Sequence, residues 1–388
     1  MTYPSVPPLG QSWSLPSCSE IALDAPGASA WNLLLSAETA ALTLATLPAT
    51  KYQDNLVAVR LVGWFLKDLW EHDQNVAYGR FLMQVTSCNC AAAVPGDPAA
   101  GLQQRHDKIF ALGLVLRNHL LRVFYSPADR TPTSSASESP PSYHQSRLDE
   151  HRALIMKRMV EIDDPGGRTH KQAKDDALLR DGYKCVMTGY YDKVTLMKIP
   201  ELNAKSSSEH VPCVDTQVVH LLPVNVQSAA SALAILKMFG LESMAERLLG
   251  NRVNSLFNTM TMCTQFREDF DQLLFWLEAV PGQEHIYTVV ARHPETFFRQ
   301  IPMPPRTVTL HVDSQAVRDY ERHGIARHLL ELPHPELIAI RATFARVAAM
   351  SGATDQIRLL REDKNNTETL TDSDTTVHLL ASLLRTLA

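Results

Sequence analysis

The sequence has few cysteines, and none of them forms a recognisable cluster. Six cysteines in 388 residues are too few and too scattered for a disulfide scaffold. Cys88 and Cys90 lack the two-residue spacer of a zinc-binding cysteine pair, and Cys185 is followed by Thr188 where a second thiol would have to stand. The sequence therefore excludes a small disulfide-rich domain and predicts structural thiols in a reducing compartment.

Long apolar runs and a leader-like start are also missing. No run of about 18 apolar residues occurs, which is the length needed to cross a bilayer. The first residues, Met1 to Pro8, do not show the basic and then apolar layout of a signal peptide. We expect no membrane partner and a cytoplasmic or nuclear location.

The chain has no excess of basic residues. Its formal net charge is −5, and residues 171–280 hold 11 Lys plus Arg against 13 Asp plus Glu. Nucleic-acid binders contact phosphates chiefly through Lys and Arg, so this balance argues against a dedicated one. A basic patch assembled from distant residues keeps nucleic acid open as a partner.

Composition and periodicity predict an α+β protein with a helical N-terminal region. Apolar residues recur at helical spacing over 31–47, 56–71 and 107–124, which predicts a bundle of helices. Between Ser126 and Ser142, 12 of 17 residues are Ser, Thr or Pro, a composition that cannot bury a core. The predicted parts are an irregular arm over 1–30 with a strand near Ile21 to Leu23, the bundle over 31–125, a linker or loop over 126–145, a domain over 146–355 and a C-terminal tail over 356–388 that is polar over 362–376.

The predicted elements of the 146–355 domain alternate helix and strand. We expect helices over 146–160, 171–180, 228–249, 264–278 and 335–350, strands over 217–222, 259–262, 286–290 and 308–312, and a polar loop over 201–208.

Three pieces of this domain carry a recognisable pattern. They read RDGYKCVMTG over 180–189, VVHLLP over 218–223, and NTMTM over 258–262 followed by FREDFD over 266–271. Together they resemble the HNH nuclease domain of a group of fungal proteins, and a match over 334–353 extends the resemblance to most of 170–355. The resemblance implies a ββα unit, in which two strands and a helix are embedded in a mainly helical protein.

The resemblance also implies roles for individual residues. His220 takes the place of the general base, and Asn258 that of the residue that holds the loop. Where the family has a metal-binding His on the helix, this chain has Arg267, whose guanidinium has no lone pair to offer a cation. Val219 stands where many HNH enzymes have an acidic ligand. We therefore expect no cofactor, with a divalent metal such as Mg only if the chain is a nuclease after all.

Each of these residues also has a purely structural interpretation. His220 can be a buried histidine with satisfied hydrogen bonds, and Asn258 can cap a turn through its amide. Arg267 can pair with Glu268 or Asp271 on its own helix, or bind an anion through its planar fork.

Three functions follow. The preferred one is a metal-independent enzyme acting on a small apolar molecule, such as a cyclase or pericyclase of fungal secondary metabolism, with His220, Asn258 and Arg267 as its catalytic residues. The alternatives are a divergent HNH endonuclease that hydrolyses DNA with a divalent metal, and a non-catalytic binding module. A large enclosed apolar cavity lined by these three residues would favour the enzyme. A filled core at the same place would favour the binding module. The substrate and the oligomeric state do not follow from the sequence.

Overall fold

The computed structural model describes residues 13–45, 50–89, 98–125, 147–161, 168–223, 229–248, 250–322 and 330–357. The chain divides into two compact units. Unit 1 comprises Met1–Tyr125, Gln227–Glu246 and Ala342–Ala388, and unit 2 comprises Ser126–Val226 and Arg247–Arg341. The predicted linker over 126–145, the start of the predicted arm and the tail beyond residue 357 lie outside the described residues.

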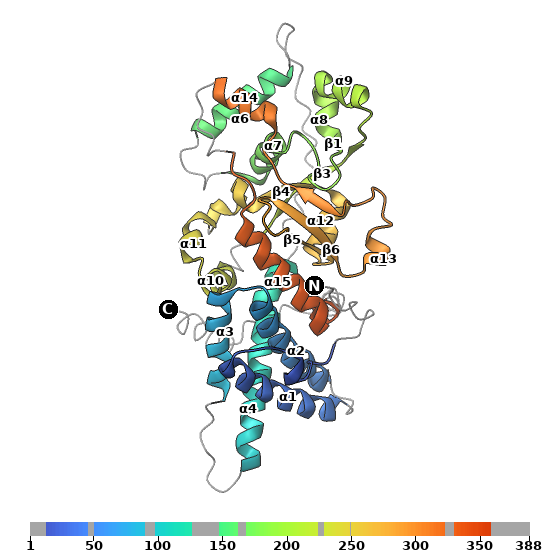
Figure 1. The fold of residues 1–388 in the computed structure, drawn as a ribbon. Helices are drawn as coiled ribbons and strands as arrows, with labels where there is room; N and C mark the ends of the chain where they lie inside the picture. Colours follow the sequence, from blue (N-terminus) through green and yellow to red (C-terminus); the bar gives the residue numbers. More distant parts are fainter. Residues whose placement is uncertain are drawn as a thin grey trace. The chain divides into compact units, whose positions relative to one another are not determined.

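Unit 1 is helical, and its central helices pack side by side (Figure 1). After a short 3-10 turn, η1 (Cys18–Glu20), its helices are α1 (Ala25–Ala45), α2 (Thr50–Glu71), α3 (Asn75–Cys88), α4 (Pro98–Val115), the π-helical η2 (Leu116–Leu121), α5 (Arg122–Tyr125) and α10 (Ala229–Met238). Helices α11 (Glu242–Leu248) and α15 (Pro335–Ser351) contain points where the chain passes from one unit to the other. The predicted bundle helices are confirmed, and α3 is an addition.

Apolar stripes on these helices build the core of unit 1. On α2, Val59, Val62, Leu66 and Leu69 are fully buried, because they recur every three or four residues and so face the same side. Phe65 packs against the ring of Phe81 on α3, with centroids 5.0 Å apart, and against Phe344 on α15 at 5.2 Å.

Helices α2 and α4 approach each other closely at a glycine. A Cβ atom placed on Gly113 would lie 2.2 Å from the backbone oxygen of Ala58, far inside van der Waals contact. Only a residue without a side chain permits this approach, which lets the two helices bury their apolar faces against each other.

Buried ion pairs connect distant segments within unit 1. Arg346 on α15 donates from Nε and Nη2 to the two carboxylate oxygens of Asp68 on α2, at 2.6 and 2.8 Å. Arg60 donates from Nε to Glu38 at 2.6 Å, and Glu38 also accepts the backbone N–H of Leu15. All four charged residues are less than a tenth exposed, so each charge depends on its partner.

Unit 2 mixes helices with three small sheets (Figure 1). Its first elements are α6 (Arg147–Glu161), α7 (His170–Arg180), β1 (Tyr191–Asp192), α8 (Lys193–Lys198), α9 (Pro200–Glu209), β2 (Cys213–Val214) and β3 (Thr216–His220). The later ones are η4 (Gly250–Asn254), η5 (Leu256–Asn258), β4 (Thr259–Cys263), α12 (Thr264–Asp271), β5 (Phe275–Ala279), β6 (Ile286–Ala291), α13 (Pro294–Phe297), β7 (Thr307–Thr309) and α14 (Ser314–Arg322). The coarse prediction of a protein of mixed helix and strand is confirmed.

The central element of unit 2 is the antiparallel pair β3 and β4, which α12 follows without a gap. Thr216 is paired with Cys263 at one end of the ladder, and His220 with Thr259 at the other. Helix α12 packs against both strands and buries Phe266 and Phe270. These rings join Phe275 and Phe297 in an aromatic cluster, with centroids 4.9 to 6.3 Å apart.

The predicted helix over 264–278 is wrong in its second half. Helix α12 ends at Asp271, and Leu273 has a positive φ of 54° that turns the chain away from the helix. Phe275–Ala279 then forms β5, the edge strand of an antiparallel sheet in the order β5, β6, β7. Aromatic and β-branched residues in β5 and β6 favour pairing over continued helix, because they pack well on a pleated surface.

Three further predictions are wrong. The single helix expected over 228–249 is divided near Gly240, whose φ is 77°, into α10 and α11. The polar segment 201–208 is not a loop but most of α9, which begins with Pro200 at its first turn and buries Leu202 and Ser206 on one side. Pro is well suited to the first turn, since no backbone N–H is needed there. The strand expected near Ile21 to Leu23 is absent, because the chain passes from η1 into α1.

No helix in the described part of the chain is long and apolar enough to cross a membrane.

Candidate functional site

His220 lies at the last position of β3 and is 8 % exposed. Its Nε2 is 3.0 Å from Oδ1 of Asn254, at the end of η4. The amide nitrogen of Asn254 donates to the carbonyl oxygen of Arg168 at 2.8 Å, which leaves the amide oxygen to accept. This network assigns the proton to Nε2, so the imidazole is a donor toward Asn254.

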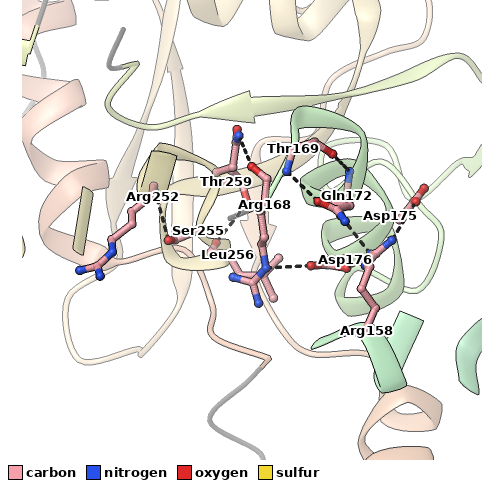
Figure 2. Close-up of polar contacts among 11 residues, drawn as sticks. Arg158, Arg168, Thr169, Gln172, Asp175, Asp176, Arg252, Ser255, Leu256 and Thr259 are labelled. Carbon is pink, nitrogen blue, oxygen red and sulfur yellow. Dashed lines mark hydrogen bonds and ion pairs between the residues drawn. The ribbon is translucent and has the colours of Figure 1, made fainter. Parts of the chain in front are cut away.

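A charged network extends from Arg168. Nε of Arg168 lies 3.0 Å from Asp176 on α7, and Arg158 on α6 also pairs with Asp176 (Figure 2). Burial raises the pKa of Asp176, while the two arginines oppose the shift. Thr169 and Gln172 form a capping box that fixes the start of α7. The backbone that accepts from Asn254 is therefore held in place by buried charges and a cap.

The pKa of His220 is lowered to about 4. Burial is the main cause, since it disfavours the charged imidazolium, and the charges of His170, Arg267 and Arg341 add to it. The hydrogen bond to Asn254 acts in the opposite direction. At neutral pH, His220 is therefore uncharged and a weak base.

Asn258 is fully buried, and all three of its side-chain hydrogen bonds go to backbone. Its Oδ1 accepts the N–H of Leu222 at 2.9 Å, while its Nδ2 donates to the carbonyl oxygens of Leu222 and Val253, both at 3.0 Å. The Asn258 carbonyl accepts the N–H of Leu221 at 2.8 Å. These bonds hold the turn after His220.

Arg267 lies on α12 and pairs with Asp271 one turn later, with Nε 3.3 Å from Oδ2. Its charge contributes to the low pKa of His220, so the structure brings these two predicted residues within electrostatic reach. Of the interpretations open for Arg267, the ion pair with Asp271 on its own helix is present, and its catalytic role stays a prediction.

A second guanidinium, that of Arg341 on α15, reaches the same place and is 1 % exposed. Its Nη1 donates to the carbonyl oxygens of His220 and Leu221, both at 3.1 Å, and its Nη2 donates to that of Phe270 at 2.5 Å. The guanidinium stacks over the Phe270 ring at 3.8 Å and lies 3.6 Å from Asp271. Arg341 therefore connects the end of β3 to α12.

The first motif piece supports the other two. Arg180, fully buried, donates to the carbonyl oxygens of Leu256 and Thr259 at 2.8 and 2.9 Å. Asp181 accepts from Arg180 and from the N–H of Thr261 at 3.0 Å. All three pieces of the sequence pattern thus meet around β3 and β4.

The residues present do not fit a divalent metal. In the described residues, no group of three or more His, Cys, Asp or Glu side chains is placed to hold a metal ion. Nε2 of His220 already donates to Asn254, and Val219 offers no ligand atom. Two guanidinium groups within electrostatic reach would repel a cation.

Sequence reasoning missed Asn254, His170 and Arg341. The imidazole of His170 lies 5.9 Å from that of His220, measured between centroids. Arg341, like Arg346, is a cation among mainly apolar residues of α15, and this pattern is a sequence signal for a buried charge. The partner oxygens of Arg341 are 71 to 121 residues away along the chain, however, and no local pattern points to them.

A cavity of about 300 Å³ opens elsewhere in unit 2, between α6, the segment 181–191, α9 and the segment 309–313. None of His220, Asn258 and Arg267 lines it. A comparison of the chain with protein-family models, with curated proteins and with solved structures finds no match.

Proposed function

We propose that this chain is a non-catalytic binding module on an HNH-like strand–strand–helix scaffold that has lost metal-dependent DNA cleavage. The observation that carries the proposal is the set of partners around the HNH positions. His220 donates to Asn254, Asn258 holds the Leu222 backbone, and Arg267 pairs with Asp271. Each side chain thus has a role in holding the fold together.

The protonation state of His220 supports the same conclusion. A general base works best when its pKa lies near the working pH. With a pKa of about 4, the imidazole of His220 accepts a proton from water poorly at neutral pH. Activation of a water molecule for phosphodiester hydrolysis therefore gains little from this residue.

A metal-independent enzyme on a small apolar molecule, such as a cyclase or pericyclase, stays the second candidate. What favours it is that His220 and Arg267 lie within electrostatic reach of each other and beside Arg341. Cyclisation needs positioned donors more than it needs a base. Incubation of the protein with extracts of small apolar metabolites, followed by mass spectrometry, tests it. A product formed by the wild type and not by His220→Ala would favour the enzyme over the module.

Plasmid nicking tests the loss of cleavage. Purified protein is incubated with supercoiled plasmid and Mg²⁺ or Mn²⁺, and calorimetry measures whether either ion binds. We expect neither nicking nor saturable metal binding, because the donor set around His220 is incomplete. Arg267→His, which reintroduces an imidazole on α12, is compared with Arg299→His at an exposed position.

Nicking that requires the metal and disappears in His220→Ala would overturn the proposal. Metal binding gained by Arg267→His and not by Arg299→His would support the proposal that this scaffold has lost one metal ligand. Both variants replace one arginine by histidine and so change the net charge equally. A difference in metal binding between them is therefore due to the position of the new histidine.

A further inference from the structure

The cavity in unit 2 is lined by none of His220, Asn258 and Arg267, although residues 181–189 of the first pattern piece form part of its wall, and several of its lining side chains are charged. Three cations line it: Arg152 from α6, Lys184 from the turn before β1, and Lys205 from α9. They come from separate elements, and the turn and both helices pack around a common core that includes Tyr183 and Leu202. The fold therefore brings three positively charged side chains to one cavity.

The cation on α6 is the most enclosed of the three. Arg152 is 7 % exposed, and its guanidinium lies 5.8 Å from the centroid of the Tyr183 ring. A guanidinium held against an aromatic face is oriented, because the ring restricts its rotation. Its planar donor groups suit the flat oxygen pair of a carboxylate or the oxygens of a phosphate.

The two lysines share a single carboxylate. Lys184 lies 3.7 Å and Lys205 3.8 Å from the two oxygens of Glu209, which also accepts from the hydroxyl of Tyr191 at 3.0 Å. The ammonium of Lys184 also lies 4.3 Å from the centroid of the Tyr191 ring. One carboxylate cannot neutralise two ammonium groups, so this wall keeps a positive balance.

The two carboxylates that line the cavity are already engaged. Asp181 faces Arg180 with both oxygens, at 2.7 and 3.0 Å, so its charge is matched by a cation outside the cavity. Asp313 accepts the backbone N–H groups of Gln315 and Ala316, both at 3.0 Å, at the start of α14. Backbone N–H groups do not cancel the charge of Asp313, so with Asp181 matched by Arg180 the formal charges at the cavity are three positive, Arg152, Lys184 and Lys205, against two negative, Asp313 and Glu209.

The dimensions and the other walls indicate a small molecule. The volume of the cavity, about 300 Å³, is at the lower end of the range of ligand pockets, about 300–1,000 Å³. Leu202 and Leu310 add apolar walls beside the cations. Polar groups that fix orientation next to apolar surface are typical of pockets for small organic ligands.

We propose that this cavity binds a small organic anion whose carboxylate or phosphate group is held by Arg152, Lys184 and Lys205. This inference goes beyond the proposed function, because it involves none of His220, Asn258 and Arg267 and stands whether or not these three residues have any activity. It also supplies a ligand class for a binding module.

Calorimetric titration of the full-length chain tests the proposal, with inorganic phosphate and benzoate as probes. Sodium chloride at the same ionic strength measures the non-specific effect of salt. We expect saturable binding of at least one probe. Lys184→Gln and Lys205→Gln should each weaken it about fivefold, and Arg152→Gln about tenfold or more, because each removes one charge-assisted contact.

Lys193→Gln is the matched control, since Lys193 is exposed on α8, pairs with Asp215 at 4.0 Å and does not line the cavity. It should bind like the wild type. Arg152 is buried, so its variant can lose the fold; Lys205, which is 56 % exposed at its side chain, keeps the test decisive. Circular dichroism identifies folded variants.

Three results would overturn the proposal. The first is that neither probe binds beyond the effect of chloride. The second is that the Lys184 and Lys205 variants bind like the Lys193 variant. The third is that a short DNA duplex, and not the small anions, binds in a way that depends on Lys205, which would assign the cations to nucleic acid.

Discussion

The side-chain amide of Asn258 forms two hydrogen bonds with the backbone of Leu222, accepting its N–H at 2.9 Å and donating to its carbonyl at 3.0 Å. Just beyond the end of β3, the side chain of Asn258 forms the two backbone hydrogen bonds that a neighbouring strand would otherwise form. Both residues are almost fully buried, so water cannot replace either bond.

Replacement of Asn258 by Ala should lower the free energy of unfolding by about 3 kcal/mol, because it removes the side-chain partners of the buried Leu222 backbone groups and of the partly buried Val253 carbonyl. Urea unfolding followed by circular dichroism measures this. Asn203→Ala, at an exposed position of α9, is the control and should change stability little. A loss below 1 kcal/mol for Asn258→Ala would mean that the turn is held by other contacts.

His220 should make the protein less stable as the pH falls. Well above pH 6.5 the imidazole is neutral in both the folded and the unfolded state, so it has no effect on stability there. Between pH 6.5 and about 4 it binds a proton in the unfolded chain and not in the folded one, which favours unfolding. The loss should reach about 3 kcal/mol near pH 4. Unfolding free energies measured from pH 8 to pH 4 test it.

The control for this experiment is a comparison of slopes. His220→Gln should flatten the dependence on pH, whereas His311→Gln, at an exposed position, should leave it unchanged. The pKa values of His106, His151 and His334 are also lowered, mainly by burial, so these residues contribute a slope common to all variants. Equal slopes in the wild type and His220→Gln would contradict the low pKa.

Two glycines within helices should respond in opposite directions to alanine. Gly113→Ala places a methyl group 2.2 Å from the Ala58 oxygen and should cost about 2 kcal/mol or more, because backbone must move. Gly79→Ala meets no atom within 4 Å and should stabilise α3 by up to about 1 kcal/mol. Melting temperatures compare them. Similar effects of the two substitutions would contradict the close approach of α2 and α4.

Removal of one partner from the buried pair of Asp68 and Arg346 should cost about 3–5 kcal/mol, since a charge is left in the core. Asp68→Asn and Arg346→Met are measured singly and together by urea unfolding. The double variant should lose less than the sum of the single ones. Glu71→Gln, at a more exposed pair with Lys67, is the control and should cost less than about 1 kcal/mol.

Periodicity predicted the elements that depend on local sequence. The structure contains the predicted bundle helices, the strand from Thr259 to Met262 and the helix that starts at Pro335. Each of them depends on residues close together in the sequence, an apolar stripe for the helices and a β-branched run for the strand. The sequence pattern also predicted that its three pieces belong together, and they meet around β3 and β4. The ion pair of Arg267 with Asp271 is local as well, since the two residues are one turn apart.

What the sequence could not provide depends on residues far apart along the chain. The end of α12 at Asp271 follows from the pairing of β5 with β6, and no signal within 264–278 overrides the helical pattern. The contacts of Arg341 join α15 to the end of β3 across 121 residues. The cavity escaped prediction for the same reason, because its cations lie on a helix, a turn and a second helix that only the tertiary fold brings together.

The division of unit 1 into separate stretches has a consequence for synthesis. Its first helices leave the ribosome long before Arg346, the partner of Asp68, has been translated, whereas both stretches of unit 2 are complete by residue 341. Domains usually fold in the order in which they are made. In this chain unit 2 can therefore complete its fold before unit 1, and Asp68 in the N-terminal helices stays without this partner until Arg346 has been made.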